Sequence, residues 1–263
     1  MTRPVRRLAA PLAVAVAALV GCSDLVVDPD AISALDFTGI PFPAVVTGDT
    51  MRDSSGAAAP LRATVYGGRG DVIGDAPVTF VALDTGVVID ASGFLRATRR
   101  DGTVRIVATV GALQSQQRTI RVTRAPDTVV APTTSVNLQY RLPDAAANVS
   151  PALQLSLRSA DTTGGVSPNV GGWLVRWRIV YAGDTLLPTD TSKVALWGAS
   201  GSRHTLRDTT TAEGSASRRL RVYANQLPVQ ADSFIVVAEV RYRGAQVPGS
   251  PVRFVVNITP PTI

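Results

Sequence analysis

The sequence predicts an all-β protein built from β-sandwiches, and two observations support this prediction. Apolar and polar residues alternate with a period of two in many short segments, and beyond residue 35 no segment has a convincing helical period. Because each segment has one apolar and one polar face, we expect antiparallel sheets that pack around an apolar core. Pairs of turn-forming residues separate these segments, such as Ser92-Gly93, Gly171-Gly172 and Pro248-Gly249.

Each alternating segment is expected to form a strand with one buried side. The clearest are residues 61–66, 104–110, 136–142, 153–157, 234–242 and 252–258. The same closing pattern of two strands occurs twice, at residues 107–111 and 120–123 and again at 237–240 and 256–259. This repetition predicts two domains, at residues 36–124 and 127–263, joined at Arg124-Ala125-Pro126-Asp127.

The N-terminal residues have the three parts of a secretory signal peptide. A basic start is followed by an apolar run at residues 8–20, which contains about 13 residues. A helix needs roughly 20 apolar residues to cross a bilayer, so the run is too short for a membrane span. It ends in Leu19-Val20-Gly21-Cys22, which resembles the lipobox of bacterial lipoproteins. An ordinary signal peptide with a chance cysteine is the alternative.

The resemblance to lipoproteins implies a lipid anchor on Cys22. In that family the cysteine thiol is joined to diacylglycerol, the chain is cut before the cysteine, and the new amino group is acylated. We therefore expect residues 1–21 to be removed and residues 22–35 to form a lipidated tether. Several acyl chains hold a protein stably on a membrane. By the sorting rule of enterobacterial lipoproteins, Ser23 favours the outer membrane. The sequence does not determine which face of that membrane the domains occupy.

The composition argues against several other classes of protein. Cys22 is the one cysteine, so an exported chain has no internal disulfide and its domains must be stabilised by packing. The formal net charge is +6, but Arg3, Arg6 and Arg7 lie in the signal peptide, which leaves about +3 on the mature chain. The remaining arginines are scattered singly along alternating segments, which is typical of solvated strand faces. No nucleic-acid partner is therefore expected.

Part of the first predicted domain resembles the bacterial immunoglobulin-like domains of the invasin and intimin type. The resemblance rests on residues 76–80, 86–97 and 101–110, which contain Ala76-Pro77-Val78, a turn ending at Gly93, and Gly102-Thr103. Phe80 stands where the family usually has tryptophan. The second predicted domain matches more weakly, at residues 173–179 and 211–216. The resemblance implies two immunoglobulin-like β-sandwich domains that serve as structural or adhesive modules and contain no catalytic residues.

The polar residues that could serve catalysis or metal binding are few. His204 is the one histidine, and with Ser202 and Asp208 it lies in a single local stretch that does not suggest a catalytic triad. One histidine nearly excludes a zinc site. Asp90, Asp101 and Asp184 could offer oxygen ligands to calcium, but turn formation is the better explanation. We therefore expect no enzyme activity, no metal and no cofactor.

Two groups of residues are candidates for contact with a ligand. Arg69-Gly70-Asp71 spells the integrin-binding tripeptide in a glycine-rich loop, although Gly-Asp is ordinary turn chemistry. Trp173, Trp177 and Tyr181 share one side of a predicted strand with valine and isoleucine between them, which favours a place in the core. Trp197, beside Gly198 in a predicted loop, is the better candidate for an exposed ring that binds a ligand.

These observations together predict a lipid-anchored protein of the cell envelope, in the outer membrane, that acts as a non-catalytic structural or adhesive module. Its expected partners are the membrane, through acyl chains on Cys22, and a cell-surface protein or polysaccharide. One alternative is a carbohydrate-binding surface lipoprotein, which would need an exposed aromatic platform around Trp197 or Trp173. The other is an accessory protein of a hydrolase with a β-sandwich fold.

Overall fold

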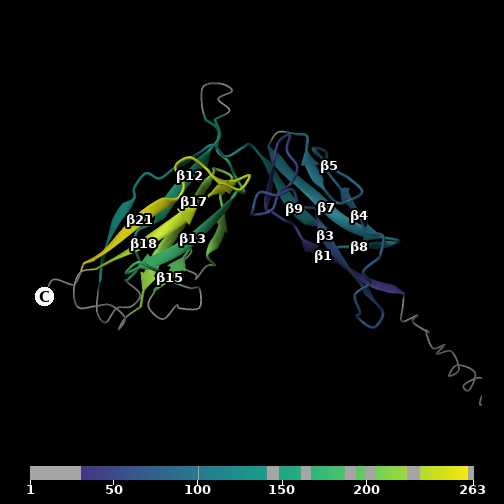
Figure 1. Cartoon of the computed structure of the whole chain (residues 1–263), viewed down its shortest axis with the longest axis horizontal. Coiled ribbons are helices and arrows are strands. Elements are labelled where there is room, and N and C mark those ends of the chain that lie inside the picture. Colours follow the sequence, from purple (N-terminus) through teal and green to yellow (C-terminus); the bar gives the residue numbers. More distant parts are fainter. Residues whose placement is uncertain are drawn as a thin grey trace, which may run out of the picture.

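The computed structural model describes residues 31–99, 101–140, 148–160, 167–186, 194–198, 205–223 and 232–259. All secondary structure in these residues is β-strand, so the all-β class that the sequence predicts is confirmed. The strands form two groups that do not pair with each other, one within residues 31–124 and one within residues 125–259. We call these the N-terminal half and the C-terminal half. They meet at one end and diverge at an angle (Figure 1).

The N-terminal half has two layers of strands. One sheet contains β2 (Ala44–Val46), β9 (Arg118–Thr123), β7 (Gly102–Val110) and β4 (Thr79–Ala82), with β8 (Leu113–Gln114) paired to β7. The other layer contains two antiparallel pairs, β1 (Ile32–Gly39) with β3 (Arg62–Gly67), and β5 (Val87–Ile89) with β6 (Leu95–Ala97). Both layers contribute side chains to one apolar core, which includes Phe37, Leu95, Ile106 and Ile120. Phe80 lies at the edge of this core, 5.3 Å from Phe37 between ring centres.

The C-terminal half is a sandwich of two larger sheets. The first runs in the order β10 (Thr128–Val130), β12 (Leu153–Arg158), β17 (Ser215–Val222) and β15 (Val194–Trp197). The second runs in the order β11 (Ser135–Gln139), β21 (Val252–Thr259), β18 (Asp232–Glu239), β13 (Leu174–Tyr181) and β14 (Asp184–Leu186), and β16 (Arg207–Thr209) also pairs with β13. A short hairpin of β19 (Arg241–Tyr242) and β20 (Ala245–Gln246) follows β18.

The period-two pattern explains the core of the C-terminal half. Along β21 the residues Val252, Phe254, Val256 and Ile258 are buried, and those between them are exposed or half-buried. The same alternation in the other long strands makes the inner faces of both sheets apolar, so they pack together. Trp177, which is 2% exposed, lies on this inner face, as the sequence predicts for it.

An ion pair between a buried arginine and a partly exposed aspartate joins the two sheets of the C-terminal half. The guanidinium of Arg218 on β17 donates to the carboxylate of Asp208 on β16, and it also donates to the carbonyl oxygen of Arg207 at 3.1 Å. The side chain of Arg218 is only 5% exposed. This pair therefore ties a strand of one sheet to an edge strand of the other.

Two expectations about strand limits need correction. The predicted strand at residues 234–242 is interrupted at Val240, whose backbone N–H donates to the hydroxyl of Ser250 instead of continuing a ladder. The predicted tether was expected to extend to residue 35, but β1 begins at Ile32, which pairs with Gly67. Residues 32–35 therefore belong to a sheet, because they find a partner strand in β3. The division into two domains at residues 124–127 remains a prediction.

The membrane-related residues of the prediction fall outside this description. Residues 1–30 contain Leu19, Val20, Gly21 and Cys22, and all four lie outside the described residues. Within the described residues, the structure contains no helix with the length and apolar character needed to cross a membrane.

Candidate functional site

The candidate site is the junction between the two halves. Strand β2 lies in this junction and contributes residues to the cores of both halves. All three residues of β2 are buried, which the period of two does not allow for a strand with one wet face. Val45 packs in the core of the N-terminal half, whereas Ala44 and Val46 pack with the core of the C-terminal half. One short strand is therefore covered on both faces, by a different half on each.

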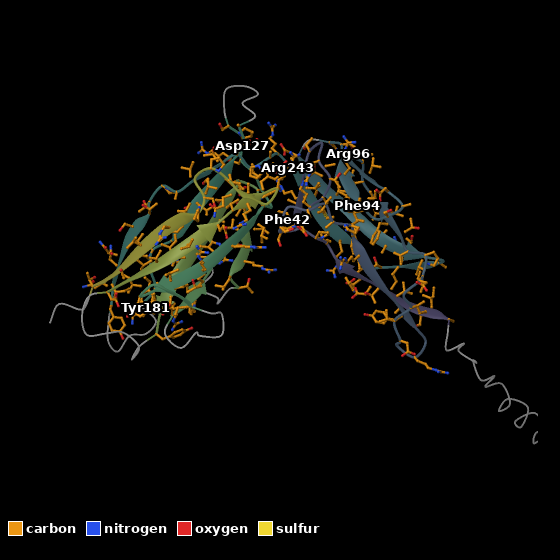
Figure 2. All side chains as sticks on the ribbon, viewed as in Figure 1. Phe42, Phe94, Arg96, Asp127, Tyr181 and Arg243 are labelled. Carbon is orange, nitrogen blue, oxygen red and sulfur yellow. The ribbon has the colours of Figure 1, made fainter. Side chains whose placement is uncertain are left out.

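Aromatic rings extend this contact across the junction. Phe42, just before β2, lies 4.8 Å from Trp173 of the C-terminal half between ring centres. Trp173 in turn lies 5.7 Å from Tyr242 in an edge-to-face arrangement. The indole nitrogen of Trp173 donates to the carbonyl oxygen of Arg241 at 3.1 Å, so this buried ring leaves no polar atom unsatisfied. Figure 2 shows Phe42 and Arg243 where the two halves meet.

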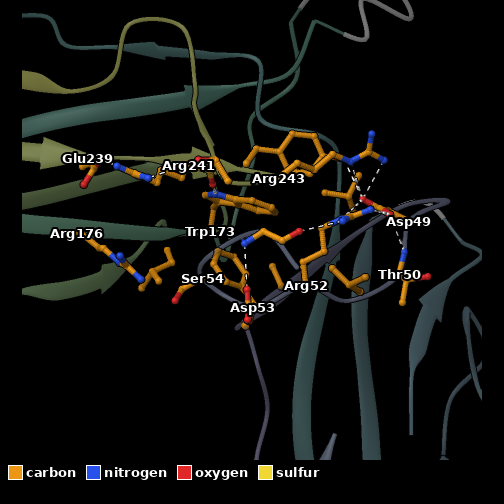
Figure 3. Close-up of a pocket in the computed structure, with 18 residues that line it drawn as sticks. Asp49, Thr50, Arg52, Asp53, Ser54, Trp173, Arg176, Glu239, Arg241 and Arg243 are labelled. Carbon is orange, nitrogen blue, oxygen red and sulfur yellow. Dashed lines mark hydrogen bonds and ion pairs between the residues drawn. The ribbon is translucent and has the colours of Figure 1, made fainter. Parts of the chain in front are cut away.

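Asp49 is the polar centre of the junction (Figure 3). Its Oδ2 accepts hydrogen bonds from Arg52 at 3.0 Å, from Arg243 at 3.1 Å and from the Tyr242 hydroxyl at 3.3 Å. Its Oδ1 accepts from the backbone N–H of Thr50 at 2.9 Å and from Arg52 at 3.1 Å. The side chain is 11% exposed. One carboxylate of the N-terminal half thus binds two groups of the C-terminal half.

The electrostatics of the junction favour the charged form of Asp49. Burial raises the pKa of this carboxyl, but the hydrogen bonds from Arg52, Arg243 and Thr50 outweigh burial and hold the pKa below its ordinary value of 3.8. Burial and the neighbouring Asp49 charge raise the pKa of Tyr242. Both groups therefore keep one charge state at neutral pH, aspartate ionised and tyrosine neutral.

Backbone segments also approach closely at the junction. A Cβ atom on Gly56 would lie 2.1 Å from the backbone nitrogen of Gly244, and one on Gly172 would lie 2.8 Å from Cδ of Arg121. The crevice that remains between the halves offers about 40 Å³ to water. Binding sites for small molecules have volumes of about 300–1,000 Å³, so the junction is a packed contact between two surfaces.

A larger hollow lies on the flank of the N-terminal half. It has a volume of about 560 Å³, and its lining residues are Thr38, Leu61, Arg62, Ala63, Thr64, Val65, Val72, Ile73, Gly74, Ala76, Val78 and Phe80. Arg62 is the one ionisable side chain among its described lining residues. Acid–base chemistry usually requires converging ionisable groups, and this lining does not supply them.

Trp197 occupies a different environment from the one expected. It ends β15 instead of lying in a loop, and it is half-buried. The guanidinium of Arg221 lies 4.2 Å from the centre of its ring and 5.3 Å from that of Tyr223. One face of the indole is therefore covered by a cation–π contact. Trp173 is 4% exposed, so neither tryptophan presents the open platform that stacking on a sugar requires.

The other candidates take part in turns or in strands. Arg69-Gly70-Asp71 is exposed in the turn after β3, with Gly70 at a φ of +84°. Asp90 caps its own turn by accepting from the backbone N–H groups of Ser92 and Phe94 at 2.9 Å each. Asp101 pairs with Arg124 at 3.0 Å, and Asp184 lies in β14. In the described parts of the chain no three His, Cys, Asp or Glu side chains gather closely enough to hold a metal ion. Ser202 and His204 lie outside the described residues.

The junction is not apparent from the amino-acid sequence. Asp49 follows Gly48 and reads as an ordinary turn residue, and the hairpin with Tyr242 and Arg243 lies almost two hundred positions further along the chain. The one available clue was the run of apolar residues in β2, which has no polar side.

Comparison with known proteins finds only distant structural similarity. No family model matches the sequence, and no curated protein matches it. Similar solved structures include the Pseudomonas aeruginosa CupB2 chaperone (TM-score 0.32, 16% identity, 50% of this chain and 55% of that one) and the Yersinia pseudotuberculosis adhesin InvE (TM-score 0.29, 16% identity, 84% and 57%). Domains 4–9 of the surface layer protein SbsC are also similar (TM-score 0.30, 13% identity, 88% and 31%).

The chain spans less than two thirds of each of these structures. The TM-scores and identities are too low to carry an argument about function. The fold class rests instead on the strand pairing described above, and it is the all-β, sandwich class that the sequence predicts.

Proposed function

We propose that this protein is a lipid-anchored, non-catalytic envelope protein whose two halves form a rigid, bent spacer. The observation that supports the spacer most directly is the junction, where β2 is covered by both halves and Asp49 binds Tyr242 and Arg243. A flexible linker would leave the halves free to reorient. A packed apolar contact with a central carboxylate network opposes such motion, because reorientation would expose apolar rings and separate buried charges.

In this arrangement the lipid lies close to the end of β1. Ten residue steps separate Cys22 from Ile32, which an extended chain covers in at most about 35 Å. Because Ile32 pairs with Gly67, the turn that carries Arg69-Gly70-Asp71 lies at this same end. A position near the anchor is unsuitable for presenting a tripeptide to another cell, and this argues for the turn function of Gly70 and Asp71.

The anchor and the spacer are tested separately. Cells producing the full chain are fed radiolabelled palmitate, and label is expected on the wild-type protein and absent from Cys22→Ala. Intact cells are then treated with protease to find which face of the membrane the halves occupy. Absence of label from the wild-type protein would refute the lipid anchor.

The rigidity of the spacer is measured on the purified Cys22→Ala protein with spin labels at Val88→Cys and Gln154→Cys, two exposed positions in different halves. A single narrow distance distribution is expected. A distribution as broad as that of two domains on a flexible linker would refute the rigid spacer and leave the anchor untouched.

A further inference from the structure

The outer face of the second sheet of the C-terminal half carries a cluster of arginines. The alternation that buries Trp177 and Phe254 turns the residues between them outward. Strand register then places the outward residues in rows. Arg207 on β16 lies directly opposite Arg176 on β13, and Arg178 and Arg253 lie on either side of Val237 in the next row.

These four residues form a compact positive surface, which we call the arginine face. Neighbouring strands are about 4.8 Å apart and residues rise about 3.3 Å along a strand. Arg178 and Arg253, two strands apart, are therefore roughly 10 Å from each other, and Arg176 and Arg178 roughly 7 Å. Arg178, Arg207 and Arg253 are exposed, and Arg176 is half-buried.

The four arginines share a single counter-charge among the described residues of this face, and the charge of Arg178 helps to lower the pKa of that acid. Glu239, opposite Arg176, is the one acid on this face among the described residues. Its carboxylate already accepts hydrogen bonds from Arg241 at 2.7 Å and from Gln246 at 3.2 Å. Figure 3 shows Arg241 joined to Glu239, with Arg176 apart and no interaction drawn to it. Like charges directly opposite each other, such as Arg176 and Arg207, destabilise a sheet, and an external anion would relieve the repulsion.

The surroundings of the arginines indicate which kind of anion fits. Val237 is only 2% exposed although it points outward, and the strand register places Arg178 and Arg253 on either side of it. No strongly exposed large apolar side chain of the described residues lies on this face. A membrane surface or a stable protein interface would call for exposed apolar or aromatic anchors.

Uncharged groups continue the face beyond the arginines. The row next to the arginines contains the half-buried apolar residues Val180, Ile235 and Val255, with the hydroxyl of Ser135 at its edge. The row after that is polar, and in it Asn257 donates to Asn137 and also reaches Ser135, at 3.2 Å each. Such polar groups are suited to the hydroxyls of a sugar chain, and guanidinium groups are suited to its carboxylates or phosphates. The surface is a broad sheet face, which suits an extended polymer better than a small ligand.

We propose that the arginine face binds an anionic polysaccharide, which lies across β16, β13, β18 and β21. This binding would give the proposed spacer a partner. That the protein meets such a polysaccharide in the cell envelope rests on the proposed function. The contact itself is a property of the folded chain, so binding is tested on purified protein, independently of the anchor and of the rigidity of the junction.

The probe is sodium alginate, a linear polyuronate, and neutral dextran of similar length is the comparison. Binding to immobilised full-length protein is measured at low and at physiological ionic strength. Alginate is expected to bind, with an affinity that falls as salt is added, and dextran is not. The variant Arg176→Gln/Arg178→Gln/Arg253→Gln is expected to bind alginate about tenfold more weakly or worse. Glutamine keeps part of the aliphatic stem of arginine, and circular dichroism verifies the fold.

The matched control removes the same charge elsewhere, at three exposed arginines on other surfaces: Arg96→Gln/Arg158→Gln/Arg219→Gln. It is expected to bind alginate like the wild type. If both variants lost the same affinity for alginate, the net charge of the protein would explain the binding, and the proposal would be overturned. Absence of alginate binding, or binding to vesicles of phosphatidylglycerol and phosphatidylcholine in place of alginate, would also overturn it.

Discussion

The carboxylate Oδ2 of Asp49 lies 3.0 Å from a guanidinium nitrogen of Arg243, and these two residues belong to different halves of the protein. Arg52, from the same half as Asp49, binds the same oxygen at 3.0 Å. The carboxylate therefore holds a guanidinium from each side of the junction. Because the charge of Asp49 is shared in this way, the residue has a larger effect on the relative position of the halves than an ordinary surface acid.

The first prediction concerns removal of this carboxylate. In Asp49→Ala, the guanidinium groups of Arg52 and Arg243 and the Tyr242 hydroxyl lose their common acceptor. We expect the free energy of unfolding to fall by about 2 kcal/mol, and the distance distribution between labels at Val88→Cys and Gln154→Cys to broaden. Asp84→Ala is the control, because Asp84 also pairs with an arginine, at 2.7 Å, but far from the junction. Its distance distribution should match that of the parent protein, and broadening there would contradict the role assigned to Asp49.

The second prediction is an acid-induced loosening of the junction. The pKa of Asp49 is lowered in the folded protein, so its stabilising effect is present above the ordinary value of 3.8 and is lost as the pH falls further, through the lowered pKa. The spin-label distance distribution is expected to stay narrow at neutral pH and to broaden below 3.8. Asp49→Asn removes the charge at every pH. If the variant and the parent broadened alike on acidification, other carboxylates would be responsible.

The third prediction concerns the approach of two backbones. Gly56 has a φ of +96°, and a methyl group there would run into the backbone of Gly244. Gly56→Ala is therefore expected to push the halves apart and to shift the spin-label distance. Gly70 has a similar φ of +84° with nothing within 4 Å of an added Cβ, so Gly70→Ala tests backbone strain alone, at a cost of about 1 kcal/mol. A shifted distance in Gly70→Ala as well would assign the effect to strain and not to contact.

The fourth prediction concerns the ion pair between the sheets of the C-terminal half. Asp208→Ala would leave Arg218, with a side chain 5% exposed, without its carboxylate. An uncompensated buried charge costs about 3–5 kcal/mol, and we expect a loss of this size in urea unfolding monitored by tryptophan fluorescence. Asp84→Ala again serves as the comparison, since its partner Arg105 is 51% exposed and can turn to water. A similar loss in the two variants would mean that this pair contributes no more than a surface pair.

The residues of the core could be predicted because their burial depends on the order of apolar and polar residues along each strand. A period of two assigns residues to alternate faces of a strand whatever the strand pairs with, so the burial of Trp177 and of the apolar residues in β21 followed from the sequence. The end of the pattern was less well defined. Val240 continues the alternation of Phe234, Val236 and Ala238, but its backbone N–H donates to Ser250 and the strand ends before it.

The candidate sites were harder to predict, for a physical reason. Trp197 was expected to be an exposed ring because glycine follows it, yet Arg221 from the adjacent strand covers one face of the indole. The sequence alone favours scattered, solvated arginines in place of the arginine face. Arg176, Arg178, Arg207 and Arg253 are separated in sequence by up to 77 positions, and strand register brings them into two adjacent rows.

The amino-acid sequence by itself therefore determined the all-β class, the alternating cores and the expectation of a lipid anchor at Cys22, because each depends on residues that are close along the chain. The tertiary structure alone decided how the halves meet and where charge gathers. Asp49 and Arg243 are 194 positions apart, and no periodicity or spacing links them. Their contact, like the arginine face, exists because the paths of the strands in space place distant residues side by side.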